Sequence, residues 1–124
     1  LWSLILTLIL VCIRVTLTLS GKKVANGFKT CGTDVSPFCV RLIRAHANCF
    51  ENLPLTLGIL FSALLLGQEN LTNTLAIPFA FARIFQSITH LISTNIIAVN
   101  IRFIFFFSQI IICIYWCLSL LTIN

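Results

Sequence analysis

Charged side chains are scarce in this sequence, and acidic ones are the scarcest. Charged residues make up 9% of the 124 positions, and only three of them are acidic. Soluble domains carry roughly a quarter of charged residues. Here 59% of the residues are hydrophobic, and the mean hydropathy is +1.07. These values exclude an ordinary soluble domain and indicate an integral membrane protein.

Two further patterns are missing. The eight Lys and Arg residues form no contiguous basic face, so nucleic acid is not an expected partner. The six cysteines show no CxxC pair and no spacing typical of zinc ligands, so no metal site is expected. We interpret these cysteines as small packing residues or free thiols, with Cys31 in a polar loop as the most exposed.

Long apolar stretches dominate the rest of the chain, and about 20 such residues form a helix that crosses a bilayer. The second stretch is expected to start with Ser36 as its N-cap and Pro37 in its first turn. The sequence therefore predicts an all-α fold, an integral membrane four-helix bundle, with residues 1–124 as one domain. The helices are expected at about residues 1–19, 36–67, 74–93 and 101–121.

The connecting loops predict the membrane topology. The first loop holds three lysines with Arg41 just beyond it, the loop at 68–73 holds no base, and the third loop adjoins Arg102. Positive charge favours the cytoplasmic side. We therefore expect the first and third loops in the cytoplasm and both termini on the other side of the membrane.

Polar residues are concentrated at 41–54, within the second apolar stretch. At about 100° per residue five of them share one helical face, while His46 points elsewhere. A charge inside a bilayer costs at least ~2.5–3.5 kcal/mol, so this face requires a partner, a water-filled cavity or a bound ion. The five residues are Arg41, Arg44, Asn48, Glu51 and Asn52.

A second polar face is expected in the third helix, where Arg83, Gln86, Ser87 and His90 follow one another at helical spacing. Arg102 begins the fourth helix, so the membrane segments hold four candidate cations and one acid, Glu51. An anionic ligand would neutralise the excess positive charge. The alternative is that buried ion pairs simply lock the helices together. For His46, a hydrogen bond between helices or subunits is the alternative to a binding role.

The same segments resemble a known family. Residues 44–52 contain R-A-H-x-N-x-x-E-N, which is similar to the second-helix signature of the MAPEG family, the membrane-associated proteins in eicosanoid and glutathione metabolism. The K-K-x-A-N stretch at 22–26 resembles the start of that family's first loop. Ala82-Arg83 resembles its third helix, and Arg102 resembles the arginine that opens its fourth.

The resemblance implies a homotrimer of four-helix subunits that binds glutathione as its thiolate at subunit interfaces on the cytosolic side. It implies Arg102 as a catalytic residue, and we expect His90, at the position where the family has tyrosine, to be the second one. A neutral imidazole could donate a hydrogen bond to the thiol sulfur, as a phenol would. With Arg41 added from the charge pattern, the candidate glutathione-binding residues are Arg41, Arg44, His46, Asn48, Glu51 and Arg83.

Several positions depart from the family pattern. His90 replaces the tyrosine, Gln86 replaces a histidine, and Val40 stands where a glutamate often precedes Arg41. Phe103 occupies the position of a serine found in eicosanoid-converting members, which disfavours prostaglandin-type isomerase chemistry. The resemblance is therefore closer to the glutathione transferase-like and bacterial type than to prostaglandin E synthase.

The leading hypothesis is a membrane glutathione transferase or peroxidase that uses glutathione as co-substrate. Its thiolate would attack a hydrophobic electrophile or a lipid hydroperoxide supplied by the bilayer. One alternative is a non-catalytic member of the same fold that binds glutathione or another anion. Another alternative is a small four-helix drug exporter, with Glu51 as its proton-coupled acid. Such exporters favour cationic cargo, and the excess of positive charge in the membrane segments argues against this function.

Overall fold

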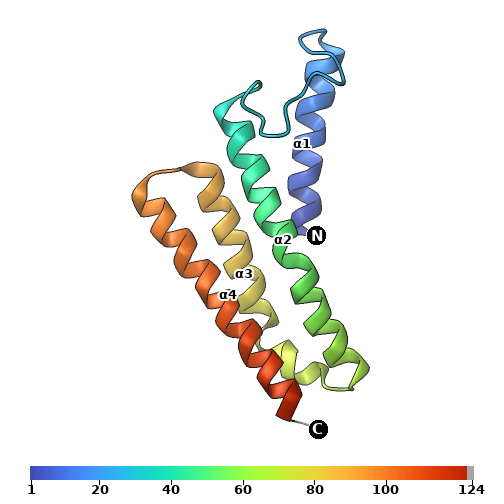
Figure 1. Cartoon of the computed structure of the whole chain (residues 1–124), viewed down its shortest axis with the longest axis vertical. Coiled ribbons are helices and arrows are strands. Elements are labelled where there is room, and N and C mark those ends of the chain that lie inside the picture. The colour runs from blue at the N-terminus through green and yellow to red at the C-terminus, as the bar shows by residue number, and fades with distance from the viewer. Residues whose placement is uncertain (123–124) are drawn as a thin grey trace.

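The protein is an elongated bundle of four α-helices in the computed structural model, which describes residues 1–122 (Figure 1). Each helix is long and apolar enough to cross a membrane. The predicted fold class, an all-α integral membrane four-helix bundle, is confirmed. The helices are α1 (Trp2–Leu19), α2 (Pro37–Leu65), α3 (Glu69–Ile92) and α4 (Ile96–Thr122).

The helices pack in chain order, and α1 packs mainly on α2 (Figure 1). A cluster of buried side chains joins α1 to the N-terminal half of α2, namely Leu6 with Leu42, Ala45 and Cys49. The small Ala45 and Cys49 allow the two helices to approach closely, as small residues do in membrane bundles. On the polar face of α2, Arg41 and Asn48 contact α3, whereas Arg44 and Glu51 remain exposed.

A second buried cluster joins the C-terminal half of α2 to α4. Its centre is Trp116, which is fully buried and lies with its ring 5.4 Å from that of Phe79 on α3. The apolar core is thus divided into two parts, and the polar residues of α2 and α3 lie between them. The members of the second cluster are Ile59, Ala63, Cys113, Trp116 and Leu120.

The start of α2 confirms the prediction from the sequence. Ser36 accepts a hydrogen bond from the backbone N–H of Cys39 at 3.1 Å, and Pro37 occupies the first helical turn. In the preceding loop, Lys23 forms an ion pair with Asp34, and Asp34 also accepts the N–H of Lys29 at 3.2 Å. The hydrogen bond from Lys23 lowers the pKa of the Asp34 carboxyl below its ordinary value.

The predicted start of the third helix was wrong. α3 begins at Glu69 rather than at residue 74, so most of the expected loop at 68–73 is helical. Gly67, at φ +65°, ends α2 and reverses the chain in a conformation that suits glycine. Glu69 then lies in the first turn of α3, where the helix dipole favours a negative charge. Thr72, only 4% exposed, packs against the bundle.

The fourth helix also begins earlier than predicted, at Ile96 rather than at residue 101. The side-chain oxygen of Asn95 accepts a hydrogen bond from the backbone N–H of Ala98 at 2.8 Å. That bond is the one made by an asparagine N-cap. The residues that suggested a turn in the sequence therefore form the first turn of a helix, and the connection between α3 and α4 is short.

Candidate functional site

A network of amide and guanidinium groups joins α2, α3 and α4 in the middle of the bundle. Nη1 of Arg83 donates to Oδ1 of Asn48 at 3.1 Å and to Oε1 of Gln86 at 3.3 Å. The same oxygen of Gln86 accepts from Nε2 of Gln109 at 3.0 Å. Gln86 and Gln109 are 3% and 2% exposed. One buried glutamine oxygen thus links a cation on α3 to an amide on α4.

Gln109 is a member of this network that the sequence analysis missed. It lies seven residues after Arg102, on the same helical face, but a single amide in an apolar stretch does not predict a partner. Its role depends on the packing of α4 on α3, which the sequence does not specify. Cys49 was interpreted from the sequence as a packing residue. It is buried, and its sulfur lies 3.1 Å from the hydroxyl oxygen of Ser87.

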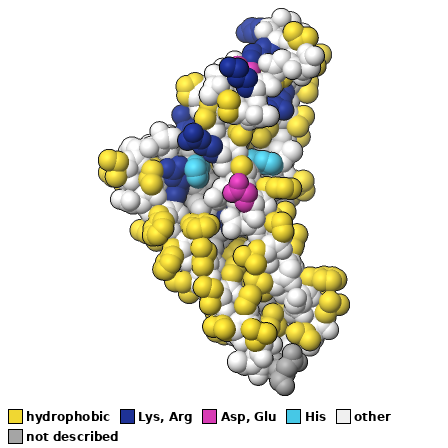
Figure 2. Space-filling view, viewed as in Figure 1, with side chains coloured by type: hydrophobic (Ala, Val, Ile, Leu, Met, Phe, Trp, Pro, Cys, Tyr) yellow, Lys and Arg dark blue, Asp and Glu magenta, His cyan; other side chains and the backbone are white. Residues whose placement is uncertain are grey.

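A separate basic cluster lies around the C-terminal end of α3. Nη1 of Arg102 lies 2.8 Å from Nδ1 of His90, and Nε of Arg41 donates to the carbonyl of Leu91 at 2.7 Å. Cations from α2 and α4 therefore meet at a helix terminus whose free carbonyls carry partial negative charge. Figure 2 shows basic side chains gathered on the upper half of the molecule, above a largely hydrophobic lower half.

The contact between Arg102 and His90 defines the state of the imidazole. A guanidinium donates hydrogen bonds and accepts none, so Nδ1 of His90 must accept the bond. The ring is consequently neutral with its proton on Nε2, which leaves Nε2–H as a donor. His90 can therefore donate a hydrogen bond to a ligand, as predicted from the sequence.

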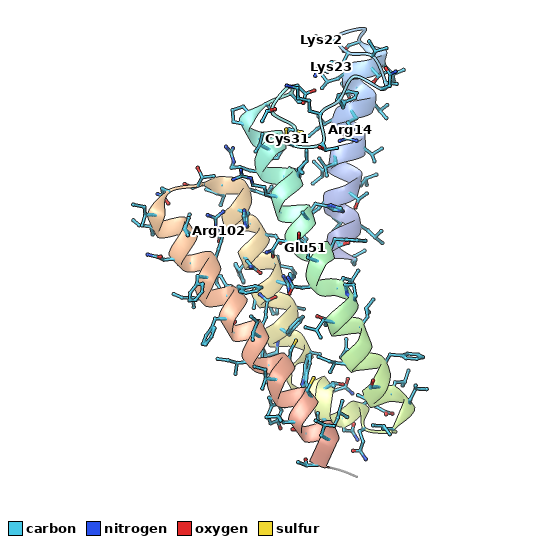
Figure 3. All side chains as sticks on the ribbon, in the orientation of Figure 1. Arg14, Lys22, Lys23, Cys31, Glu51 and Arg102 are labelled. Carbon is cyan, nitrogen blue, oxygen red and sulfur yellow. The ribbon has the colours of Figure 1, made fainter. Side chains whose placement is uncertain are left out.

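The other charged candidates on α2 have no ionic partner within residues 1–122. Arg44 and Glu51 are both exposed, and Figure 3 labels Glu51 between the ribbons of α1 and α3. Within residues 1–122, the only ion pair is the one between Lys23 and Asp34. The alternative interpretation was that buried ion pairs lock the helices together. Within residues 1–122, no such pair involves Arg44, Glu51 or Arg83.

His46 contacts α1 rather than the polar face of α2. Its Nε2 lies 2.9 Å from the hydroxyl of Thr7, and its ring stacks on Phe50 with centroids 6.2 Å apart. This geometry is the hydrogen bond between helices that was weighed for His46 from the sequence. Its assignment as a glutathione-binding residue stays a prediction.

The candidate residues therefore fall into distinct groups. Arg41, His90 and Arg102 meet at the end of α3, whereas Asn48 and Arg83 meet deeper in the bundle. Arg44 follows Arg41 by three residues on α2, about one helical turn away. This arrangement offers an anionic ligand several cations at one end of the membrane-spanning bundle.

The fold and these two sites define a polytopic membrane protein with an excess of cations in its bundle. The family model that describes the MAPEG family matches residues 1–122, and the chain belongs to this family. It is accordingly a glutathione-related membrane protein. The search of curated proteins and that of solved structures found no match for the chain.

Proposed function

We propose that the protein is a membrane glutathione transferase or peroxidase that binds glutathione as a thiolate at the end of α3. The observation that carries this proposal is the convergence of Arg41 and Arg102 on the last turn of α3, beside a neutral His90. Family membership supports glutathione as the anion. The phenylalanine at position 103, which is 63% exposed on α4, favours transferase-type over prostaglandin-type chemistry.

The chemistry of glutathione suits these residues. Its two carboxylates match guanidinium groups through paired hydrogen bonds, and its ammonium matches the exposed carboxylate of Glu51. A nearby guanidinium also stabilises the thiolate, which is the nucleophile. In a transferase step the sulfur would form a bond to an electrophilic carbon while the leaving group departs with the bonding electrons.

We also propose that the protein works as a homotrimer with this site facing the cytoplasm and both termini on the opposite side. The three lysines of the first loop support this orientation. Arg44 and Glu51 remain exposed on a helix that spans the membrane, and charged groups in such positions usually contact another protein surface or a polar ligand. A neighbouring subunit would provide such a surface.

Thiolate formation provides the first test of the proposed function. Purified protein in detergent is expected to increase ultraviolet thiolate absorption when glutathione is added at neutral pH. It should also conjugate glutathione to a small aryl halide or reduce a lipid hydroperoxide. Absence of both binding and turnover at millimolar glutathione would contradict the proposal. Binding without turnover over a broad electrophile panel would instead support a non-catalytic member.

His90 gives a second prediction, because its Nε2–H is a free donor beside Arg102. His90→Phe removes the donor and should decrease the fraction of bound thiolate about tenfold at a fixed pH below half-titration, since a hydrogen bond to a charged group contributes ~1.5–3 kcal/mol. His90→Tyr restores a donor and should retain the thiolate. The measurement is a pH titration of thiolate absorbance for each protein.

The two substitutions at position 90 control for each other, since both place a six-membered aromatic ring there. Matching titrations for wild type and His90→Phe would show that the imidazole only packs the helix. A loss in both variants would indicate that the bond to Arg102, rather than the donor, is what matters.

A further inference from the structure

Four basic residues gather where α1 meets the first loop, around the ring of Phe28. The guanidinium carbon of Arg14 lies 5.6 Å from the centroid of that ring, and Nζ of Lys23 lies 5.4 Å from it. Lys22 and Lys29 are exposed, and each adjoins one of these loop residues in the chain. Figure 3 labels Arg14, Lys22 and Lys23 near this end of α1. We call the four basic residues and Phe28 the first-loop patch.

The first-loop patch carries more positive charge than the neighbouring acid neutralises. Within residues 1–122, Asp34 is the only acid in an ion pair, and its partner is Lys23. Arg14, Lys22 and Lys29 have no carboxylate within ion-pair distance in that range. The contact between Lys29 and Asp34 uses the backbone N–H, so it leaves the ammonium group free. Three cations in one patch therefore lack a counter-charge.

Arg14 lies within the membrane-spanning length of α1, on an exposed face of the helix. Val11 and Val15 lie on this face at helical spacing and are 49% and 48% exposed. Arg14 precedes Leu19, the last residue of α1, by five positions, which is a rise of about 7–8 Å. A long arginine side chain can cover that distance and hold its charge near the membrane surface. Its contact with Phe28 of the loop agrees with this orientation.

The C-terminal end of α1 does not occupy these cations. Free carbonyls at such an end carry partial negative charge and attract basic side chains. Here the carbonyls of Thr16, Leu17 and Thr18 accept backbone N–H groups from residues 20–23 at 3.0–3.2 Å. Within residues 1–122, no basic side chain of the first-loop patch donates a hydrogen bond to them. The positive charge of the patch is therefore available to an external anion.

We propose that the first-loop patch binds the head group of an anionic phospholipid in the leaflet next to the loop. Arg14 pairs with the lipid phosphate from the membrane side, and Lys22 and Lys29 meet the head group from the water side. The acyl chains lie against the exposed face of α1 that carries Val11 and Val15.

The position of Arg14 favours a lipid over a free phosphate ion, because Arg14 follows an exposed apolar face of a membrane-spanning helix. The net charge of the patch favours an anionic lipid over a zwitterionic one. In a zwitterionic head group a cation accompanies the phosphate, and like charges repel. This site is separate from the basic cluster at the end of α3, so the proposal does not depend on glutathione binding.

Native mass spectrometry of the purified chain in detergent can test this assignment. Phosphatidylglycerol and phosphatidylcholine with identical acyl chains are titrated separately, and the lipid adducts are counted per chain. The first phosphatidylglycerol is expected to bind about tenfold more tightly than the first phosphatidylcholine. Each cation near a membrane surface contributes about fivefold, and screening by salt reduces the combined effect of three. Millimolar inorganic phosphate should not displace the bound lipid.

Arg14→Gln should decrease the preference for phosphatidylglycerol about fivefold, and Lys22→Gln combined with Lys29→Gln should decrease it at least as much. The matched control is Arg102→Gln, which removes one arginine from the basic cluster at the end of α3 and should retain the preference. The titrations contain no glutathione, so an inactive glutathione site would not affect them. Equal affinities for the two lipids would overturn the proposal. So would displacement by inorganic phosphate, or equal effects of the two arginine substitutions.

Discussion

Arg102→Gln is expected to lower kcat/KM for glutathione conjugation by about 10²–10³-fold, the cost of removing one preorganised donor from an active site. Arg102 contacts His90 at 2.8 Å and its own helix at the carbonyl of Ala98, so its guanidinium is already oriented. Glutamine can still donate a hydrogen bond but carries no charge. The loss should therefore appear as weaker thiolate absorbance as well as slower turnover.

The control for this substitution is Arg14→Gln, because Arg14 is an exposed arginine on α1. Its removal changes the net charge by the same amount at a position that no proposed step uses. Turnover by Arg102→Gln within a factor of about three of wild type would exclude Arg102 from the reaction. Arg102→Lys is informative as well, since it preserves the charge without the planar fork that orients His90.

The sequence was sufficient to predict the elements of the fold. Hydrophobic length alone located four helices, and Ser36 followed by Pro37 correctly located the start of α2. The errors lie at residues whose role depends on a neighbour. Asn95 belongs to a turn by composition, yet it caps α4 because its side chain meets the N–H of Ala98. Similarly, the polar residues after Gly67 form a helix because Thr72 is buried against the bundle.

The candidate site was only partly predictable for the same reason. Spacing on one helix correctly brought Asn48 to the face of α2 that meets α3, where it bonds to Arg83. Spacing could not reveal that Gln109 joins them, since that contact depends on how α3 packs on α4. It also could not separate the basic cluster at the end of α3 from Arg83 deeper in the bundle.

Trp116→Ala is expected to decrease the free energy of unfolding by about 3 kcal/mol, more than any other substitution discussed here. Trp116 is fully buried among Ile59, Ala63 and Cys113, and its ring lies against Phe79. Tryptophan-to-alanine changes in cores cost ~3–5 kcal/mol. The lower end applies because a bilayer is itself apolar, so the loss comes from packing rather than from exposure to water. The measurement is unfolding by added SDS in mixed micelles, followed by circular dichroism.

Two comparisons separate lost packing from other causes. Trp116→Phe preserves an aromatic ring, and the indole N–H that it removes has no hydrogen-bond partner in residues 1–122, so its cost should be about 1 kcal/mol. Leu118→Ala changes a side chain that is 58% exposed on the same helix and should cost less than about 0.5 kcal/mol. If Trp116→Ala were no more destabilising than Leu118→Ala, α4 would not be held to α2 through this cluster.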